Sequence, residues 1–159
     1  MSSQPGVRFG MWGLAVLAAA SPSCVGPKAN VRYVVPDGYR GLLAICVDRP
    51  GGETVWETGE AFTFVFPADG VIRLRDRGPF FSRPYRNLSE YAGGGPIRFA
   101  AYADAVPESE VAFWELSNDD AGILWYYVGD SRSMKRMATR EERTRFADLH
   151  RLGRSGGPP

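Results

Sequence analysis

The chain has few of the residues that most often build metal and nucleophilic sites. Of its 159 residues, two are cysteine, at positions 24 and 46, and one is histidine, His150. A structural zinc site takes four cysteine or histidine ligands, so these three residues exclude a zinc cluster of the usual kind. The histidine lies among arginines near the C-terminus, which makes a Ser–His–Asp or Cys–His arrangement improbable. The sequence also lacks a phosphate-binding glycine loop followed by lysine and serine or threonine.

These absences favour a protein that is not an enzyme, and we expect no catalytic residue, no cofactor and no metal. They do not exclude a pair of carboxylates for glycoside hydrolysis, because the separation of such a pair depends on the fold. However, no acidic residue lies in an obviously apolar setting that would raise its pKa. The sequence therefore indicates no general acid of that kind.

The chain also has little net charge. Lysine and arginine total 19 against 18 for aspartate and glutamate, which gives a formal net charge of +1. Such a balance produces no overall field that would attract nucleic acid, and we expect no nucleic-acid partner. With 44% apolar and 13% aromatic residues, the chain is typical of one folded domain with a hydrophobic core.

The N-terminal apolar run is too short to cross a membrane. It covers residues 11–20, whereas a spanning helix needs about 20 apolar residues. The run follows a single basic residue, Arg8, and is followed by small residues, which is the pattern of a secretory signal peptide. We predict that residues 1–23 are an export signal and that residues 24–30 form a tether.

This segment contains two alternative processing sites. Residues 18–20 are all alanine and fit ordinary signal peptidase, which would release a chain beginning at Ser21. Cys24, just past the apolar run, instead resembles the acylated cysteine of bacterial lipoproteins. The resemblance covers the first 24 residues; Ser23 fits the pattern of that family, whereas Ser21 and Pro22 depart from it. It implies a protein anchored to a membrane surface by a lipid on Cys24, and we favour this alternative.

The second cysteine has two interpretations that depend on the first. If Cys24 is lipidated, Cys46 is an inert buried thiol, because it lies between Ile45 and Val47 in an apolar strand, where cysteine behaves as a small hydrophobe. If Cys24 is not lipidated, the two cysteines can form a disulfide, which exported compartments permit. We favour the inert thiol.

The strongest structural pattern lies at residues 34–47. Pro36, Asp37 and Gly38 are turn formers, and residues 42–47 follow as a strand that is apolar on both alternating faces. Such a strand must be covered on both sides. We therefore expect it at the centre of the domain.

The rest of the body consists of short apolar strands separated by turn residues. Residues 62–66 place three phenylalanines at period two, which predicts a strand with one aromatic core face, and residues 71–75 alternate apolar and basic positions. Residues 111–116 and 123–128 are predicted to form a hairpin. The fold class is predicted as all-β, an antiparallel β-sandwich of about seven to nine strands over residues 31–130.

The segment 76–96 mixes arginine with aromatic residues and ends in a glycine run. Such a mixture can stack on and clamp an anionic or planar ligand, although it is also typical of a surface loop that aromatic side chains pin to a sheet. Long loops carry function more often than sheets do. The expected ligand-binding residues are Arg77, Phe81, Arg83, Tyr85 and Arg86.

Residues 131–153 are predicted to contain one basic helix. Thr139 and Glu142 form a capping box at its start. An apolar stripe at helical spacing docks this helix on the sheet: Phe146, Leu149 and Leu152. Residues 154–159 are expected to be a disordered tail.

Three stretches together resemble an uncharacterised family of exported bacterial β domains. They are Val-Pro-Asp-Gly-Tyr-Arg-Gly at 35–41, Phe-Thr-Phe-Val-Phe-Pro-Ala-Asp-Gly-Val-Ile at 62–72 and Trp-Tyr-Tyr-Val-Gly-Asp at 125–130. The resemblance covers roughly residues 33–130 and implies a small envelope domain of unknown function. The chain departs from the family in its longer segment 76–96 and in its C-terminal helix.

The sequence therefore predicts an exported, lipid-anchored protein of the bacterial cell envelope that acts as a non-enzymatic binding or structural module. Its expected partners are the membrane, through Cys24, and an envelope protein or glycan. The alternative is a small hydrolase or ligand carrier that uses the segment 76–96.

Overall fold

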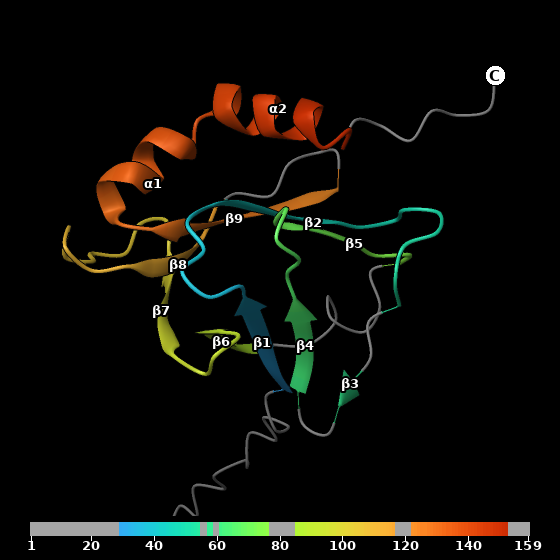
Figure 1. Cartoon of the computed structure of the whole chain (residues 1–159), viewed down its shortest axis with the longest axis horizontal. Helices are drawn as coiled ribbons and strands as arrows, with labels where there is room; N and C mark the ends of the chain where they lie inside the picture. The colour runs from blue at the N-terminus through green and yellow to red at the C-terminus, as the bar shows by residue number, and fades with distance from the viewer. Residues whose placement is uncertain (1–28, 55–56, 59–60, 77–84, 117–121, 153–159) are drawn as a thin grey trace, which may run out of the picture.

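The computed structural model describes residues 29–54, 57–58, 61–76, 85–116 and 122–152. Nine strands and two helices occur in these ranges (Figure 1). The strands are β1 Ala29–Val35, β2 Gly41–Cys46, β3 Glu57–Thr58, β4 Ala61–Val65, β5 Val71–Arg73, β6 Tyr85–Tyr91, β7 Pro96–Ala101, β8 Ala112–Glu115 and β9 Ile123–Gly129. The helices are α1 Ser131–Met137 and α2 Arg140–Leu149.

The nine strands form one mixed sheet in the order β3-β4-β1-β6-β7-β8-β9-β2-β5. β1 pairs in parallel with β4 and β6, β2 with β5, and β7 with β8, while the other pairs are antiparallel. The sheet curls so that the half holding β1 faces the half holding β2, which gives a nearly closed, barrel-like body (Figure 1). The all-β class and the number of strands are as predicted. The antiparallel sandwich is wrong.

Two proline–glycine turns join strands that lie in opposite halves of the sheet. The first closes with a hydrogen bond from the Tyr39 N–H to the Pro36 carbonyl, at 3.0 Å. The second closes with one from the Gly70 N–H to the Pro67 carbonyl, at 2.9 Å. Neither turn joins neighbouring strands, because β1 and β2 lie in opposite halves of the sheet, as do β4 and β5. The two strand–turn–strand units instead stack side by side, β4 parallel to β1 and β5 parallel to β2.

The inner core lies between the two halves of the sheet. Alternate residues of β1 and β4 point into it and are at most 4% exposed: Val31, Tyr33, Val35, Phe62 and Phe64. The Tyr33 ring stacks on Phe113 of β8 with ring centroids 4.9 Å apart, and its hydroxyl lies 3.3 Å from that of Tyr126 on β9. The predicted aromatic core face of β4 is confirmed, and the adjacent Val65 points outward and is 65% exposed.

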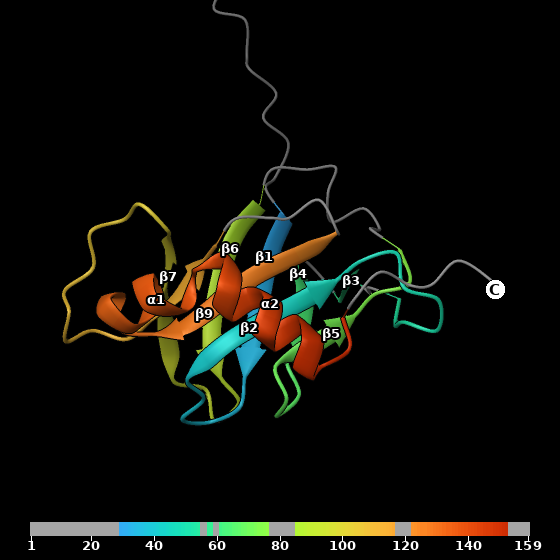
Figure 2. The ribbon, with the colours of Figure 1, turned by 90° about the horizontal axis from the view of Figure 1, so that it is seen from above.

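Strand β2 is covered on both faces, as the sequence predicts. Leu43 and Ile45 belong to the inner core, while Leu42, Ala44 and Cys46 face a second core beneath the helices. Strands β8 and β9 and the two helices contribute the larger side chains of this second core: Trp114, Trp125, Met134 and Phe146. Figure 2 shows α2 lying over β2 and β9.

The hairpin predicted from residues 111–116 and 123–128 is confirmed. β8 and β9 pair antiparallel, with Phe113 opposite Val128 and Glu115 opposite Tyr126. β9 is buried along its whole length, because β8 and β2 flank it and a core layer covers each of its faces. Most of the connecting turn, residues 117–121, lies outside the described residues.

Two helices, rather than the single predicted one, cover the half of the sheet that holds β2. α2 begins where predicted, with the Thr139 hydroxyl accepting a hydrogen bond from the Glu142 N–H at 3.3 Å. The unpredicted α1 begins after Asp130, whose carboxylate accepts a hydrogen bond from the Ser133 N–H at 2.8 Å. Aspartate is a favoured N-cap residue, so the signal for α1 is present in the sequence. In the described ranges, no helix is long and apolar enough to cross a membrane.

The docking face of α2 differs from the prediction at one position. Phe146 and Leu152 pack into the second core, but Leu149 is 77% exposed. The helix ends at Leu149, and Arg151 has a φ of 52°, which turns the chain so that Leu152 returns to the sheet. Helical spacing therefore does not extend to Leu152.

Two arginines from the sheet side hold the C-terminal end of α2. Arg49 donates a hydrogen bond to the Leu152 carbonyl and Arg73 donates one to the His150 carbonyl, both at 3.1 Å. Cations at this end of a helix satisfy carbonyls that lack helical partners and complement the helix dipole. The Nδ1 atom of His150 also lies 4.0 Å from the Asp69 carboxylate.

We expect Gly52→Ala to lower the free energy of unfolding by about 1–3 kcal/mol. A Cβ at this buried glycine would lie 2.6 Å from the Leu74 carbonyl carbon and 2.7 Å from the Arg75 nitrogen, both backbone atoms that cannot rotate away. Urea unfolding measures the effect. Gly95→Ala is the control, because a Cβ there meets only an ordinary contact, 3.6 Å from Tyr91. Equal losses in the two variants would contradict this packing.

Candidate functional site

The predicted ligand-binding residues lie largely outside the described ranges. Three of them fall there: Arg77, Phe81 and Arg83. Tyr85 begins β6, where its backbone is in register with Ala29 of β1, and Arg86 is exposed at the next position. The described residues thus show no contact among the five, and this site stays a prediction.

The two cysteines are in different situations. Cys24 lies outside the described residues, so lipidation and the disulfide both stay predictions. Cys46 is 1% exposed and lies on the face of β2 that meets the second core, beside Leu42 and Ala44. This is the buried apolar setting that the sequence predicts for Cys46.

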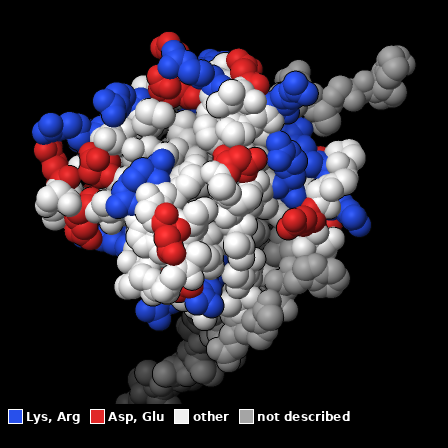
Figure 3. All heavy atoms as spheres, in the orientation of Figure 1, with Lys and Arg blue, Asp and Glu red and all other residues white. Residues whose placement is uncertain are grey.

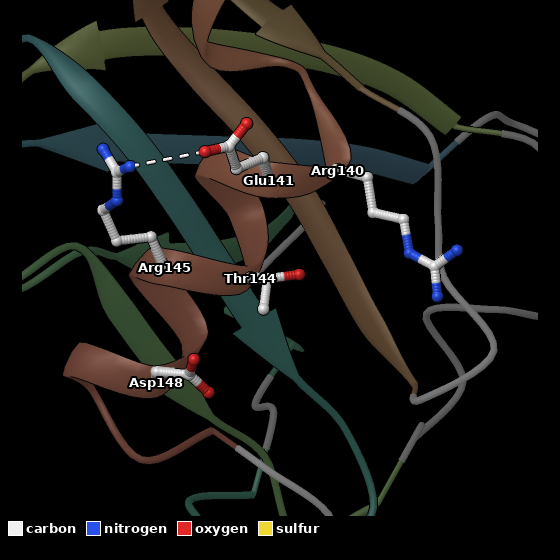
Figure 4. A pocket seen from close by; sticks show the side chains of 5 residues that line it. All are labelled: Arg140, Glu141, Thr144, Arg145 and Asp148. Atoms are coloured by element: carbon white, nitrogen blue, oxygen red, sulfur yellow. Dashed lines mark ion pairs between the residues drawn. The ribbon is translucent and has the colours of Figure 1, made fainter.

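Charged side chains line a shallow hollow on the outer face of α2 (Figure 4). Its residues are Arg140, Glu141, Thr144, Arg145 and Asp148. Arg145 pairs with Glu141 at 3.5 Å and with Glu142 at 3.1 Å, one helical turn away. Exposed pairs of this kind stabilise a helix by only about 0.2–0.5 kcal/mol each. This hollow is a solvated helix surface that charges of both signs cover.

A second hollow, which we call the β7–β8 cleft, combines an apolar lining with one carboxyl group. It has a volume of about 550 Å³ and lies where β7 and β8 end, next to the junction of α1 and α2. Its lining residues are Ala101, Tyr102, Ala103, Glu115, Leu116 and Ala138. Ligand pockets typically have volumes of about 300–1,000 Å³ and apolar walls with a few placed polar groups. The cleft is therefore the candidate site.

A tight turn after β7 forms one wall of the cleft. Ala101 lies beside Glu115 in the parallel register of β7 and β8. The Asp104 carboxylate accepts a hydrogen bond from the Ala101 N–H at 2.8 Å, and the Asp104 N–H donates to the Ala101 carbonyl at 2.9 Å. These two bonds fix the turn that presents Tyr102, which is 55% exposed, beside the strand ends.

Glu115 is the charged group of the cleft. Its side chain reaches the surface, yet the surrounding protein partly desolvates the carboxyl group and raises its pKa. It has no hydrogen bond or ion pair with any described residue, whereas Glu90 pairs with Arg32 and Glu108 pairs with Arg132 at 2.8 Å. The raised pKa means that the folded protein binds the proton of the Glu115 carboxyl group more tightly than the unfolded chain does. The contribution of Glu115 to stability therefore falls as the pH rises through its pKa.

Glu115 also borders a buried tyrosine pair. It lies opposite Tyr126 across the β8–β9 ladder, and Tyr126 is linked to Tyr33 by the hydroxyl contact of the inner core. Burial raises the pKa of Tyr126, the Glu115 charge raises it further, and the bond with Tyr33 opposes both. Tyr126 therefore stays protonated at neutral pH, and among the described residues that line the cleft Glu115 is the charged one.

Glu115 and Tyr102 are not among the site residues predicted from the sequence. The expectation that no acidic residue has its pKa raised by an apolar setting is wrong for Glu115: its side chain is exposed, but partial burial raises its pKa. A signal is present, since Glu115 is the single carboxylate within the apolar run 111–116. The run predicts a core strand correctly, but it does not show that the strand ends at the rim of a cleft.

The chain shows limited similarity to known proteins. No family model matches the chain, and no curated protein matches it. Among solved structures, the crystal structure of a "Putative Lipoprotein from Bacillus anthracis" matches with a TM-score of 0.47 and 14% sequence identity, over 79% of this chain and 94% of that chain. A likeness at this level does not transfer a function from one protein to the other.

Proposed function

We propose that this protein is exported to the bacterial cell envelope, is anchored there by a lipid on Cys24, and acts as a non-enzymatic binding or structural module. The observation that supports the anchor is the position of Cys24, which follows the apolar run 11–20 and comes shortly before the folded body. Four residues, 25–28, separate Cys24 from Ala29, the first residue of β1. An extended chain spans at most about 3.6 Å per residue, so a lipid on Cys24 would hold the start of β1 within about 18 Å of the membrane.

This anchor would orient the body. β1 begins on the side of the molecule opposite α1 and α2 (Figure 1). The starts of β4 and β6 lie beside it, since Asn30 is in register with Ala61 and Ala29 with Tyr85. The tethered protein would therefore turn the starts of β1, β4 and β6 to the membrane and its two helices away from it. Blue and red side chains are mixed over the exposed helices (Figure 3), a surface suited to water.

Intact mass and membrane fractionation test the anchor. We expect the protein, expressed in a bacterial host that processes lipoproteins, to begin at Cys24, to carry added acyl mass and to be found with the membranes. Cys24→Ala should abolish the added mass and release the protein from the membranes. Ser23→Ala is the control, because it changes the neighbouring residue and keeps the cysteine.

A soluble chain that begins at Ser21 would overturn the anchor and favour a freely exported protein. In that case, a mass lower by two hydrogens under non-reducing conditions would identify the disulfide between Cys24 and Cys46. Reduction and alkylation of the intact chain distinguishes the two forms.

A further inference from the structure

Two features of the β7–β8 cleft point to a ligand. Glu115 lines the cleft beside apolar residues; its side chain is exposed, is partly desolvated by the protein, and has no ionic or hydrogen-bonding partner among the described residues. A large aromatic side chain, Tyr102, lines the same cleft and is 55% exposed, although most aromatic residues of the described body are in its two cores. A carboxylate in an apolar setting gains much from a positive partner, because such a setting strengthens charge–charge attraction.

We propose that the β7–β8 cleft binds a small organic cation, such as a substituted ammonium group on a short apolar body. The Glu115 carboxylate is its counter-charge, Tyr102 offers the face of its ring, and Leu116 and the alanines contact the apolar part. This inference goes beyond the proposed function and holds whether or not Cys24 carries a lipid.

The lining favours a cation over other ligand classes. An anion would meet the Glu115 charge with no cationic side chain among the described lining residues to offset it. A neutral apolar ligand would cover the carboxyl group and desolvate it further without supplying a partner, which is costly. A substituted ammonium group supplies the missing charge and is attracted to an aromatic face as well.

Among the described residues that line the cleft, Glu115 carries the carboxyl group, while the Asp104 carboxylate of the adjoining turn accepts a hydrogen bond from the Ala101 N–H. Tyr126 of β9, which lies opposite Glu115, stays neutral because burial raises the pKa of its hydroxyl. The junction of α1 and α2 contributes Ala138, which carries no charge. Cation binding should therefore weaken as the pH falls and Glu115 is protonated. The loss should begin at a higher pH than for an ordinary glutamate, because burial raises this pKa.

The test is a titration of the processed protein with choline, followed by the backbone amide signals in two-dimensional NMR spectra. The matched probe is 3,3-dimethylbutan-1-ol, which has the shape of choline with a carbon in place of the charged nitrogen. We expect choline to shift the amide signals of residues 101–103 and 115–116. We expect it to bind at least about fivefold more tightly than the neutral probe, a difference of about 1 kcal/mol.

Two variants distinguish the effect of the Glu115 charge on choline binding from the effect of the net charge of the protein. Glu115→Gln keeps the shape of the side chain and should weaken choline binding at least about fivefold, with little effect on the neutral probe. Glu141→Gln makes the same change in net charge on the outer face of α2, where the side chain is 82% exposed, and should leave binding within about twofold. Thermal unfolding of both variants checks that they are folded.

Four results would overturn the proposal. The first is equal affinity for choline and its neutral analogue, and the second is an unchanged choline affinity in Glu115→Gln; either would show that the Glu115 charge does not hold the ligand. The third is a set of shifts away from the cleft. The fourth is no shift at choline concentrations up to about 50 mM, which would place any affinity well beyond the millimolar range.

Discussion

Replacing Phe64 with alanine should lower the free energy of unfolding by about 3–5 kcal/mol, the usual cost of removing a buried phenylalanine side chain. Phe64 is 4% exposed and lies on the inner face of β4. Its ring centroid is 5.8 Å from that of Tyr33, at an interplanar angle of 20°. Tyr33 also stacks on Phe99 and Phe113, so the cavity would open in a cluster of rings that span both halves of the sheet.

The adjacent Val65 provides the control. It lies on the same strand, points outward and is 65% exposed, so Val65→Ala should change the free energy of unfolding by no more than about 0.5 kcal/mol. Urea unfolding of both variants at one pH gives the comparison. A larger loss for Val65→Ala than for Phe64→Ala would mean that β4 is shifted by one residue, because such a shift exchanges the two faces of a strand.

Local patterns predicted the features that depend on nearby residues. The two apolar faces of β2 follow from an uninterrupted apolar run, and the inner face of β4 follows from phenylalanine at every second position. The start of α2 follows from Thr139 and Glu142, because an N-cap bond joins residues only three positions apart. Each of these is fixed within a few residues of chain.

The strand order could not be predicted in the same way. The turn after Pro36 has the residues of a tight turn, and it is one, but turn chemistry does not say whether the strands on either side pair with each other. Here the two strands belong to opposite halves of the sheet, and β1 instead pairs with β4 and β6. The residues of β4 and β6 that lie in register with β1 are 31 or more positions away along the chain. Parallel pairing of this kind is decided by packing between distant segments.

The cleft could not be predicted from the sequence for the same reason. Glu115, Tyr102 and Ala138 come from a strand, a turn and a helix junction, and no short sequence window contains all three. The single glutamate in an apolar run was a usable signal for one of them. The raised pKa of Glu115 depends on its folded surroundings, and therefore needed the structure.

Replacing Trp125 with alanine should also lower the free energy of unfolding by about 3–5 kcal/mol, and it should loosen α2 in particular. Trp125 of β9 is 2% exposed and lies in the second core, against which α2 packs. Phe146 meets it edge-on with ring centroids 5.9 Å apart, and the Arg143 guanidinium lies 6.0 Å from the centre of the Trp125 ring. Both contacts disappear in Trp125→Ala, whereas the inner core on the other face of β9 is left intact.

Hydrogen exchange of the α2 amides, measured together with urea unfolding, separates the two parts of this effect. In Trp125→Ala, we expect the exchange rates of the α2 amides to rise by a larger factor than those of the β1 amides. The reason is that α2 loses its contacts with Trp125, whereas β1 packs in the inner core. Leu149→Ala is the matched control: its side chain is 77% exposed at the end of the same helix, so it should change stability by no more than about 0.5 kcal/mol. If Leu149→Ala instead cost as much as Trp125→Ala, α2 would be rotated towards the docking face that helical spacing alone predicts, with Leu149 against the sheet.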